Sequence, residues 1–152
     1  MKRIIILLIV LFVCQLANAQ KTETNIPKYS LTIGVLQGGG SLLGFDLEVM
    51  SVNRLGVQMG IGFLGYGLGV NYHFRETVKS SYISLQYWHQ GIGFTHIQSL
   101  VGPSYVFRAK KVFTFQIGVG FLVEKGEKYN SVFKTEVPAM LTYAIGFYIP
   151  WK

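Results

Sequence analysis

Residues 55–75 read LGVQMGIGFLGYGLGVNYHFR, and this stretch decides the fold. Bulky apolar residues alternate with small or polar ones up to Phe63, and the alternation resumes one step out of phase at Tyr66. Period-2 alternation is typical of a β-strand with two different faces. Because a two-residue turn keeps its flanking residues on one face, Leu64–Gly65 predicts a hairpin in which Phe63 and Tyr66 are cross-strand partners.

The two faces of this hairpin differ in size and polarity. One face is bulky and apolar, whereas the other is mostly glycine with a few polar groups. A soluble antiparallel sheet usually turns its apolar face inward and carries charge on its outer face. Because glycine supplies neither bulk nor charge, we expect the glycine face to line a narrow barrel and the bulky face to contact lipid.

The same alternation recurs along the rest of the chain. It predicts eight strands, over about residues 29–36, 43–51, 55–63, 66–75, 81–89, 100–108, 112–123 and 138–149. The even strand number and the alternation of short and longer connections predict an all-β fold, an eight-stranded antiparallel up-and-down transmembrane β-barrel. The glycine-rich residues 37–41 are expected to form a flexible loop. Pro103 is expected to introduce a bulge or a local opening in its strand.

The first 19 residues have the pattern of a cleaved secretory signal peptide. Lys2 and Arg3 form a charged region, residues 4–13 are apolar, and residues 17–19 (Ala-Asn-Ala) form a small-x-small cleavage site. The apolar run is too short for a comfortable membrane-spanning helix. The predicted organisation is therefore a signal peptide over residues 1–19 and an outer-membrane β-barrel domain over residues 20–152.

The only cysteine, Cys14, lies inside the predicted signal peptide. Its acylation would make the chain a lipoprotein, but the bulky Val13 before it disfavours this alternative, because such sites usually carry a small residue there. The mature chain would then contain no thiol and no disulfide, so other interactions must hold the fold.

The chain carries a formal net charge of +7, which falls to +5 when Lys2 and Arg3 are removed. The cations lie mainly at predicted turns, such as those at Lys79 and Lys110, and do not cluster as in a nucleic-acid reader. No nucleic-acid partner is therefore expected, and anionic lipid head groups are the natural partner of this charge. Fifty per cent of the residues are hydrophobic, without a long apolar run after residue 20, which favours a β-barrel over a helical membrane protein.

Several ionisable side chains are predicted to face the lumen. Asp46 and Glu48 lie two residues apart on one strand, so both would enter the same narrow space. Two carboxylates there would lose hydration and repel each other unless cations or water compensate them. We therefore expect a structural polar network that closes the lumen, in preference to acid–base catalysis by the two carboxylates. Its predicted members are Asp46, Glu48, His73, Arg75 and Arg108.

With its signal peptide, strand count and dyad repeat, the chain resembles the small eight-stranded outer-membrane β-barrels of the OmpA/OmpX type over residues 29–151. The resemblance implies a place in the outer membrane of a Gram-negative-type cell, contact with outer-membrane lipid and lipopolysaccharide, and insertion by the barrel-insertion machinery. Members of this family often end on an aromatic residue, whereas here Trp151 is followed by Lys152.

These observations predict a non-enzymatic protein with a structural or surface-interaction role through its loops and a closed lumen. No catalytic, cofactor-binding or metal-binding residue is predicted, and no cofactor. One alternative is a soluble lipocalin-like carrier of apolar ligands, which would need the bulky face inside. A phosphate-binding role for Gly67, Gly69 and the other repeated glycines fails, because they follow the alternation of a strand and open no helix.

A second alternative is a lipid A-modifying enzyme. Some eight-stranded barrels are lipid A deacylases, with a Ser–His pair two residues apart on the lipid-facing wall and an acidic partner. Here His89, His96 and Ser99 form a looser group near the outer rim, and His96 and Ser99 are three residues apart. Because a nucleophile needs its base within hydrogen-bond reach, this spacing predicts no catalytic group between His89 and Ser99.

Overall fold

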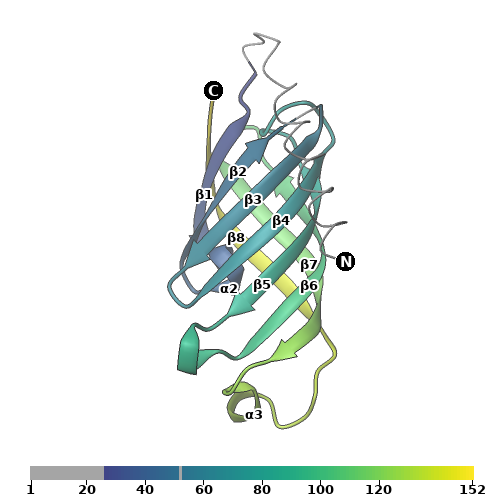
Figure 1. The fold of residues 1–152 in the computed structure, drawn as a ribbon. Helices are drawn as coiled ribbons and strands as arrows, with labels where there is room; N and C mark the ends of the chain where they lie inside the picture. Colours follow the sequence, from purple (N-terminus) through teal and green to yellow (C-terminus); the bar gives the residue numbers. More distant parts are fainter. Residues whose placement is uncertain (1–25, 52) are drawn as a thin grey trace, which may run out of the picture.

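The computed structural model describes residues 26–51 and 53–152. The predicted signal peptide and Cys14 lie outside the described residues. Eight antiparallel strands form a closed barrel in which each strand pairs with its sequence neighbours and β8 pairs with β1 (Figure 1). The strands are β1 (Tyr29–Val35), β2 (Gly44–Met50), β3 (Leu55–Gly62), β4 (Gly65–His73), β5 (Tyr82–Gln90), β6 (Gln98–Arg108), β7 (Phe113–Lys125) and β8 (Ala139–Trp151). The predicted all-β, eight-stranded up-and-down barrel is confirmed.

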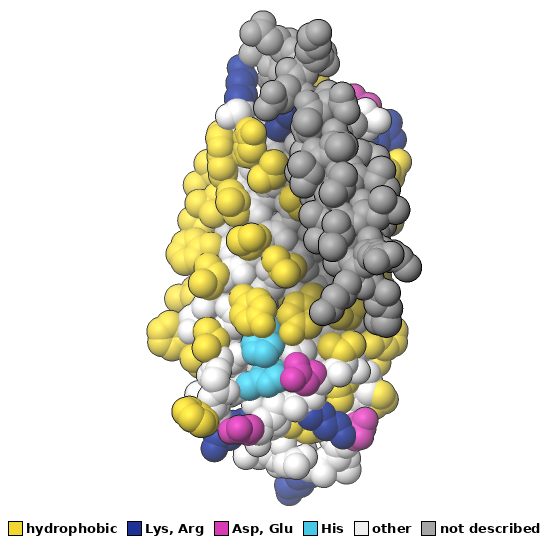
Figure 2. Space-filling model, viewed as in Figure 1, with side chains coloured by type: hydrophobic (Ala, Val, Ile, Leu, Met, Phe, Trp, Pro, Cys, Tyr) yellow, Lys and Arg dark blue, Asp and Glu magenta, His cyan; other side chains and the backbone are white. Residues whose placement is uncertain are grey.

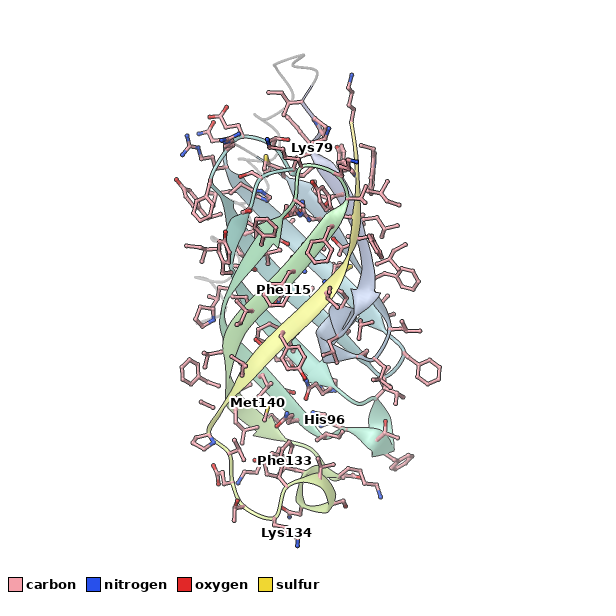
Figure 3. The ribbon with its side chains drawn as sticks, turned by 180° about the vertical axis from the view of Figure 1, so that it is seen from behind. Lys79, His96, Phe115, Phe133, Lys134 and Met140 are labelled. Carbon is pink, nitrogen blue, oxygen red and sulfur yellow. The ribbon has the colours of Figure 1, made fainter. Side chains whose placement is uncertain are left out.

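Large apolar side chains face outward along the barrel wall, and glycine and buried polar side chains face inward. The cross-strand pairs Val57–Val70 and Phe115–Ile145 belong to the outer face. On the face that Figure 2 shows, apolar side chains cover the middle of the wall and charged ones gather towards its ends. Figure 3 shows Phe115 midway along the wall, with Lys79 and Lys134 at opposite ends of the molecule. The predicted sidedness of the strands is therefore correct.

The central hairpin turns one residue earlier than predicted. Its two-residue turn is Phe63–Leu64, so Gly62 pairs with Gly65 and Ile61 pairs with Tyr66. The predicted Phe63–Tyr66 pair is therefore wrong. Ser41 explains the position of the turn: its Oγ accepts a hydrogen bond from the Leu64 N–H at 3.3 Å and would lie 3.0 Å from a Cβ atom on Gly65. Only glycine at the inward-facing ends of β3 and β4 leaves room for this contact.

The glycine-rich connection between β1 and β2 is a short helix, α2 (Gln37–Gly40), that lies inside the barrel (Figure 1). Gln37, Gly38 and Gly39 are buried, and the φ angles of 62° at Gly38 and 85° at Gly39 are in the region that favours glycine. The glycines of the wall make room for it: a Cβ atom on Gly60 would lie 3.0 Å from the Gly38 Cα, and one on Gly67 would lie 3.2 Å from the Gly39 N. The prediction of a flexible loop is wrong, because this segment fills the space that the glycine lining leaves.

Pro103 was expected to introduce a bulge or a local opening, and the structure has no bulge there but a local interruption of the β6–β7 ladder at Gly102 and Pro103. Pairing between β6 and β7 has the same register before and after Pro103, from Val101–Phe121 to Ser104–Gly118. The register shifts instead near the start of β6 and the end of β7: Leu100 pairs with Leu122, but the preceding residue, Ser99, pairs with Glu124, so Val123 is the extra residue on β7. Such a bulge reverses which face the following side chain occupies.

The connections at the end of the barrel that holds this bulge carry the remaining short helices. The 3-10 helix η1 (Gly93–Thr95) lies between β5 and β6, and α3 (Tyr129–Val132) lies between β7 and β8 (Figure 1). Among residues 26–51 and 53–152, no helix has the length and apolar character needed to cross a membrane.

Candidate functional site

A charged network occupies the lumen near the rim that carries the β4–β5 turn. Glu48 lies at its centre, with Oε2 2.8 Å from Arg108 Nη2 and Oε1 2.8 Å from His73 Nε2. Ser30 Oγ donates a hydrogen bond to Glu48 Oε2 at 3.0 Å, and Asn71 Nδ2 donates to Oε1 at 2.5 Å. All five side chains are buried. We call Ser30, Glu48, Asn71, His73 and Arg108 the lumen network.

Aromatic rings and a backbone carbonyl also stabilise the Arg108 guanidinium. The guanidinium carbon lies 4.6 Å from the centroid of the Tyr148 ring and 5.1 Å from that of the Tyr82 ring, which is cation–π geometry. Arg108 Nη1 donates to the Val78 carbonyl oxygen in the β4–β5 turn. The lumen network therefore connects strands β2, β4 and β6 to the β4–β5 turn.

Two of the predicted members lie apart from this network. Asp46 is buried nearer the middle of the barrel, where Oδ2 accepts a hydrogen bond from the Gly38 N–H at 3.3 Å and holds α2 against the wall. The predicted lumen position of Arg75 is wrong, since its side chain is exposed. Strand β4 ends at His73, so the alternation of inward and outward side chains does not extend to Arg75. Asp46 and Glu48 thus have different partners and do not form a paired acid–base site.

Sequence reasoning missed the uncharged members of the interior. Asn71 and Tyr82 lie at inward positions of β4 and β5, and period-2 alternation would have found them. Further towards α2, Gln116 Nε2 donates to Gln86 Oε1 at 2.6 Å. The space between α2 and these glutamines is only about 10 Å³, room for about one water molecule. A larger cavity of about 180 Å³, lined by Trp88, Gln90 and Thr142 among others, lies beyond α2.

A second polar group lies on the outer wall and centres on Ser99. Ser99 Oγ lies 3.0 Å from His89 Nδ1, 3.2 Å from His96 Nε2, 3.2 Å from Glu124 Oε2 and 3.1 Å from the Tyr87 hydroxyl. Ser99 is buried beneath these neighbours, His89 and His96 are half-buried, and Glu124 is exposed. We call these five residues the Ser99 cluster.

Strand register and the β6–β7 bulge assemble the Ser99 cluster. His89 is directly opposite Ser99 in the β5–β6 pair, and Ser99 is opposite Glu124 in the β6–β7 pair. Regular alternation after Phe121, which faces outward, would turn Glu124 into the lumen. The bulge turns it outward beside Ser99. His96 follows η1 and is fixed by backbone hydrogen bonds, since its N–H donates to Gly93 and its carbonyl accepts from Lys128.

Ring stacking orients the two histidines of the cluster. The ring centroids of His89 and His96 are 4.1 Å apart, with 14° between the ring planes. The Tyr66 ring also stacks on His89, with 4.6 Å between the centroids. Figure 2 shows the histidines next to an acidic side chain, at the border between the apolar wall and the polar end of the molecule. The cluster therefore combines groups that suit nucleophilic chemistry or metal binding at the edge of the apolar surface.

The expectation of no Ser–His pair depended on the spacing of His96 and Ser99 along the chain. His89 was named in the same group, but its direct pairing with Ser99 across β5 and β6 was not predicted, and Glu124, which a bulge redirects, was missed. The register of β5 against β6 would have shown that His89 is opposite Ser99. The alternation pattern could not have shown the position of Glu124, because a bulge interrupts the pattern before that residue.

An apolar groove of about 490 Å³ crosses the outer wall beside the cluster. Outward side chains of β2 to β6 line it, among them Val57, Leu68, Leu85 and Val101. Tyr87 lines the same groove and contacts Ser99 through its hydroxyl, so the groove leads to the cluster.

Comparisons with known proteins assign no family, since no family model, curated protein or solved structure matches the chain.

Proposed function

We propose that this chain is a small integral outer-membrane β-barrel protein of the OmpA/OmpX-like type, non-enzymatic and with a closed lumen, which acts in a structural or surface-interaction role through its loops. The observation that carries the proposal is the apolar outer wall around a polar, buried interior. This is the arrangement of a barrel whose solvent is lipid. It also disfavours a lipocalin-like carrier, which would need an apolar interior.

Backbone pairing supports a membrane-spanning wall. A β-strand in hydrocarbon must have its backbone groups paired, and about 9–11 residues cross the membrane at the usual tilt. β1 and β2 have seven residues each, but hydrogen bonds continue past their ends, from Lys28 N to the Trp151 carbonyl and from Leu36 N to the Leu42 carbonyl. The closed ring of strands leaves no unpaired edge.

The two rims support the orientation and the partners. Tyr29 and Trp151 stack at 6.0 Å on the rim that holds the described chain ends, where aromatic residues would lie in the lipid head-group layer. In an outer-membrane barrel this rim is periplasmic, and the loops with η1 and α3 face outward. Outer-membrane lipid and lipopolysaccharide are then the partners of the wall, and the insertion machinery acts during assembly. Phe94 in η1 is the most exposed large apolar side chain of the outward loops, at 84%.

Membrane fractionation tests this proposal. The protein is expressed with its own first 19 residues in a Gram-negative host, and membranes are washed with high salt and at alkaline pH. We expect the protein to stay in the outer-membrane fraction, to lose the N-terminal segment and to migrate differently in gels before and after heating. Release by the alkaline wash, or migration that heating does not change, would contradict the proposal.

One observation favours a second function, a lipid acyl hydrolase. His89 Nδ1 lies 3.0 Å from Ser99 Oγ, within reach of a general base for a serine nucleophile, and an apolar groove leads to Tyr87 in the same cluster. Two features rank it second: Ser99 is buried, and Glu124 contacts the serine itself, where a catalytic triad places the acid on the histidine.

Acyl release from lipid A tests the second function. The folded protein is incubated with lipid A in detergent, and products are followed by mass spectrometry. Release that is lost in Ser99→Ala but kept in Ser104→Ala, a buried serine of the lumen, would establish Ser99 as a nucleophile and overturn the non-enzymatic proposal. A parent protein that releases no acyl chain would reject the second function.

A further inference from the structure

The Ser99 cluster contains three metal-ligating side chains from three separate segments. His89 is near the end of β5, His96 follows η1, and Glu124 is near the end of β7. One ligand atom of each, a ring nitrogen of either histidine or a carboxylate oxygen, lies within 4.8 Å of the others. We propose that His89, His96 and Glu124 bind a divalent first-row transition-metal ion, with Zn²⁺ as the best match.

The hydrogen bonds around Ser99 leave one contact unsatisfied. A hydroxyl donates one hydrogen bond and accepts two, whereas Ser99 Oγ has four polar neighbours within 3.2 Å. The Glu124 carboxylate only accepts, so it takes the single Ser99 proton, and two of the other three neighbours can donate to Ser99. The third, Tyr87 or one histidine, then makes no hydrogen bond to Ser99, although Tyr87 can pair with His89 Nδ1 at 3.3 Å. A metal ion among these groups would bind the two histidine nitrogens and the carboxylate at once and leave Ser99 with fewer competing neighbours.

The ligand types determine the class of ion. Two imidazole nitrogens with one carboxylate suit Zn²⁺ and its neighbours in the first transition row, whereas Ca²⁺ and Mg²⁺ prefer all-oxygen sites. Three protein ligands leave a fourth position for water, as in open zinc sites. Zinc–ligand distances of about 2.0–2.2 Å separate two ligands by at most about 4.4 Å. The ligand atoms lie within 4.8 Å of one another, so a small inward movement of the exposed Glu124 side chain is enough to bring its oxygen to bonding distance. The His89 and His96 rings are stacked with 14° between their planes, so one ring must also turn out of the stack for both nitrogens to point at one ion.

The surroundings orient the ligands. His89 is held by its strand and by the stacked Tyr66 ring, and its Nδ1, which faces Ser99, also lies 3.3 Å from the Tyr87 hydroxyl. These contacts hold the nitrogen toward the cluster. Through His96 the site connects the β5–β6 loop to β5 and β7 of the wall, so metal binding would fix this outward loop, which is part of the contact surface in the proposed function.

Metal titration of the intact protein tests the site. Protein extracted in detergent from expressing cells is treated with chelator, dialysed and titrated with Zn²⁺ by calorimetry, and Co²⁺ spectra report the coordination geometry. We expect one Zn²⁺ per chain, with affinity reduced at least about tenfold in His89→Gln, His96→Gln and Glu124→Gln. Glu136→Gln is the matched control, because the exposed Glu136 carboxylate pairs with Lys125 and lies outside the cluster. The zinc affinity of this variant should equal that of the parent.

Ser99→Ala separates metal binding from the second function. It removes the proposed nucleophile but none of the three ligands, so it should keep the zinc affinity within about tenfold while abolishing any acyl release. Heat-modifiable migration identifies variants that have not folded, and Glu124→Gln, at an exposed strand end, decides the question if a histidine variant does not fold. No saturable binding to the folded parent, or equal affinity in the parent and the folded Glu124→Gln protein, would overturn the metal site.

Discussion

Glu48 on β2 and Arg108 on β6 come from opposite sides of the ring of strands, and their side chains meet in the lumen with 2.8 Å between Oε2 and Nη2. The two strands share no backbone ladder, so this contact joins parts of the wall that the sheet does not join directly. Replacing Glu48 by Gln removes the negative charge and leaves the buried guanidinium without its ion-pair partner. We expect the free energy of unfolding in lipid, measured with urea, to fall by about 3–5 kcal/mol.

A double-mutant cycle isolates the Glu48–Arg108 interaction. The double variant Glu48→Gln/Arg108→Gln should lose less stability than the two single variants together, because no buried charge is left without a partner. Arg75→Gln is the control: Arg75 is exposed, so its replacement should change the stability by no more than about 0.5 kcal/mol. Effects of Glu48→Gln and Arg108→Gln that add within about 0.3–0.5 kcal/mol would contradict the coupling.

The outward position of Val70 gives a second prediction. Val70 is 55% exposed on the apolar wall and is opposite Val57. If the wall is in contact with lipid, Val70→Arg should reduce the stability in bilayers by about 2–4 kcal/mol near the midplane. Val57→Arg should have the same effect for the same reason. The measurement is reversible unfolding in lipid vesicles.

Val132 provides a control with matched exposure. It is 56% exposed but lies in α3, outside the strands. Val132→Arg should therefore change the stability by no more than about 0.5 kcal/mol. If Val70→Arg folded into bilayers as well as the parent, the lipid-facing assignment of the wall would be wrong.

Alternation along each strand was enough to predict the closed barrel and the side on which bulky residues lie. It depends on local sequence alone, because successive side chains point to opposite faces. The position of the central turn was not predictable in this way. Phe63–Leu64, rather than Leu64–Gly65, forms the turn because Ser41, from another segment, occupies the space beside Gly65.

The sites were predictable only where the alternation is unbroken. Glu48, His73 and Arg108 lie in the lumen, where the alternation places them. Arg75 follows the end of β4 and is exposed, because the alternation does not extend past His73. The Ser99 cluster depends on the register of neighbouring strands and on the bulge at Glu124. Both are long-range features, since they depend on how one strand is placed against another.

The inward helix α2 gives the third prediction. Gly38 has a φ angle of 62°, and a Cβ atom there would lie 2.6 Å from the Gly62 N. Gly38→Ala thus introduces both backbone strain and a collision with β3. The strain costs about 1–2 kcal/mol and the overpacking about 1–3 kcal/mol, so we expect urea unfolding to show a loss of about 2–5 kcal/mol.

Gly93 is the matched control for the collision. Its φ angle of 56° is close to that of Gly38, but a Cβ atom there would have nothing within 4 Å. Gly93→Ala should therefore cost only the strain of about 1–2 kcal/mol. Equal losses in Gly38→Ala and Gly93→Ala would show that α2 does not pack against the wall.

Conductance across planar bilayers tests the closure of the lumen by α2 and the lumen network. The two obstructions lie in series, with α2 between the outer mouth and the Glu48–Arg108 pair near the other rim. We therefore expect no steady conductance in the parent and none in Gly38→Ala, because the lumen network still closes the barrel when α2 is displaced. Combining Gly38→Ala with Glu48→Gln/Arg108→Gln disrupts both obstructions and should produce open events. A steady open conductance in the parent would contradict the closed lumen and make a small pore the better description.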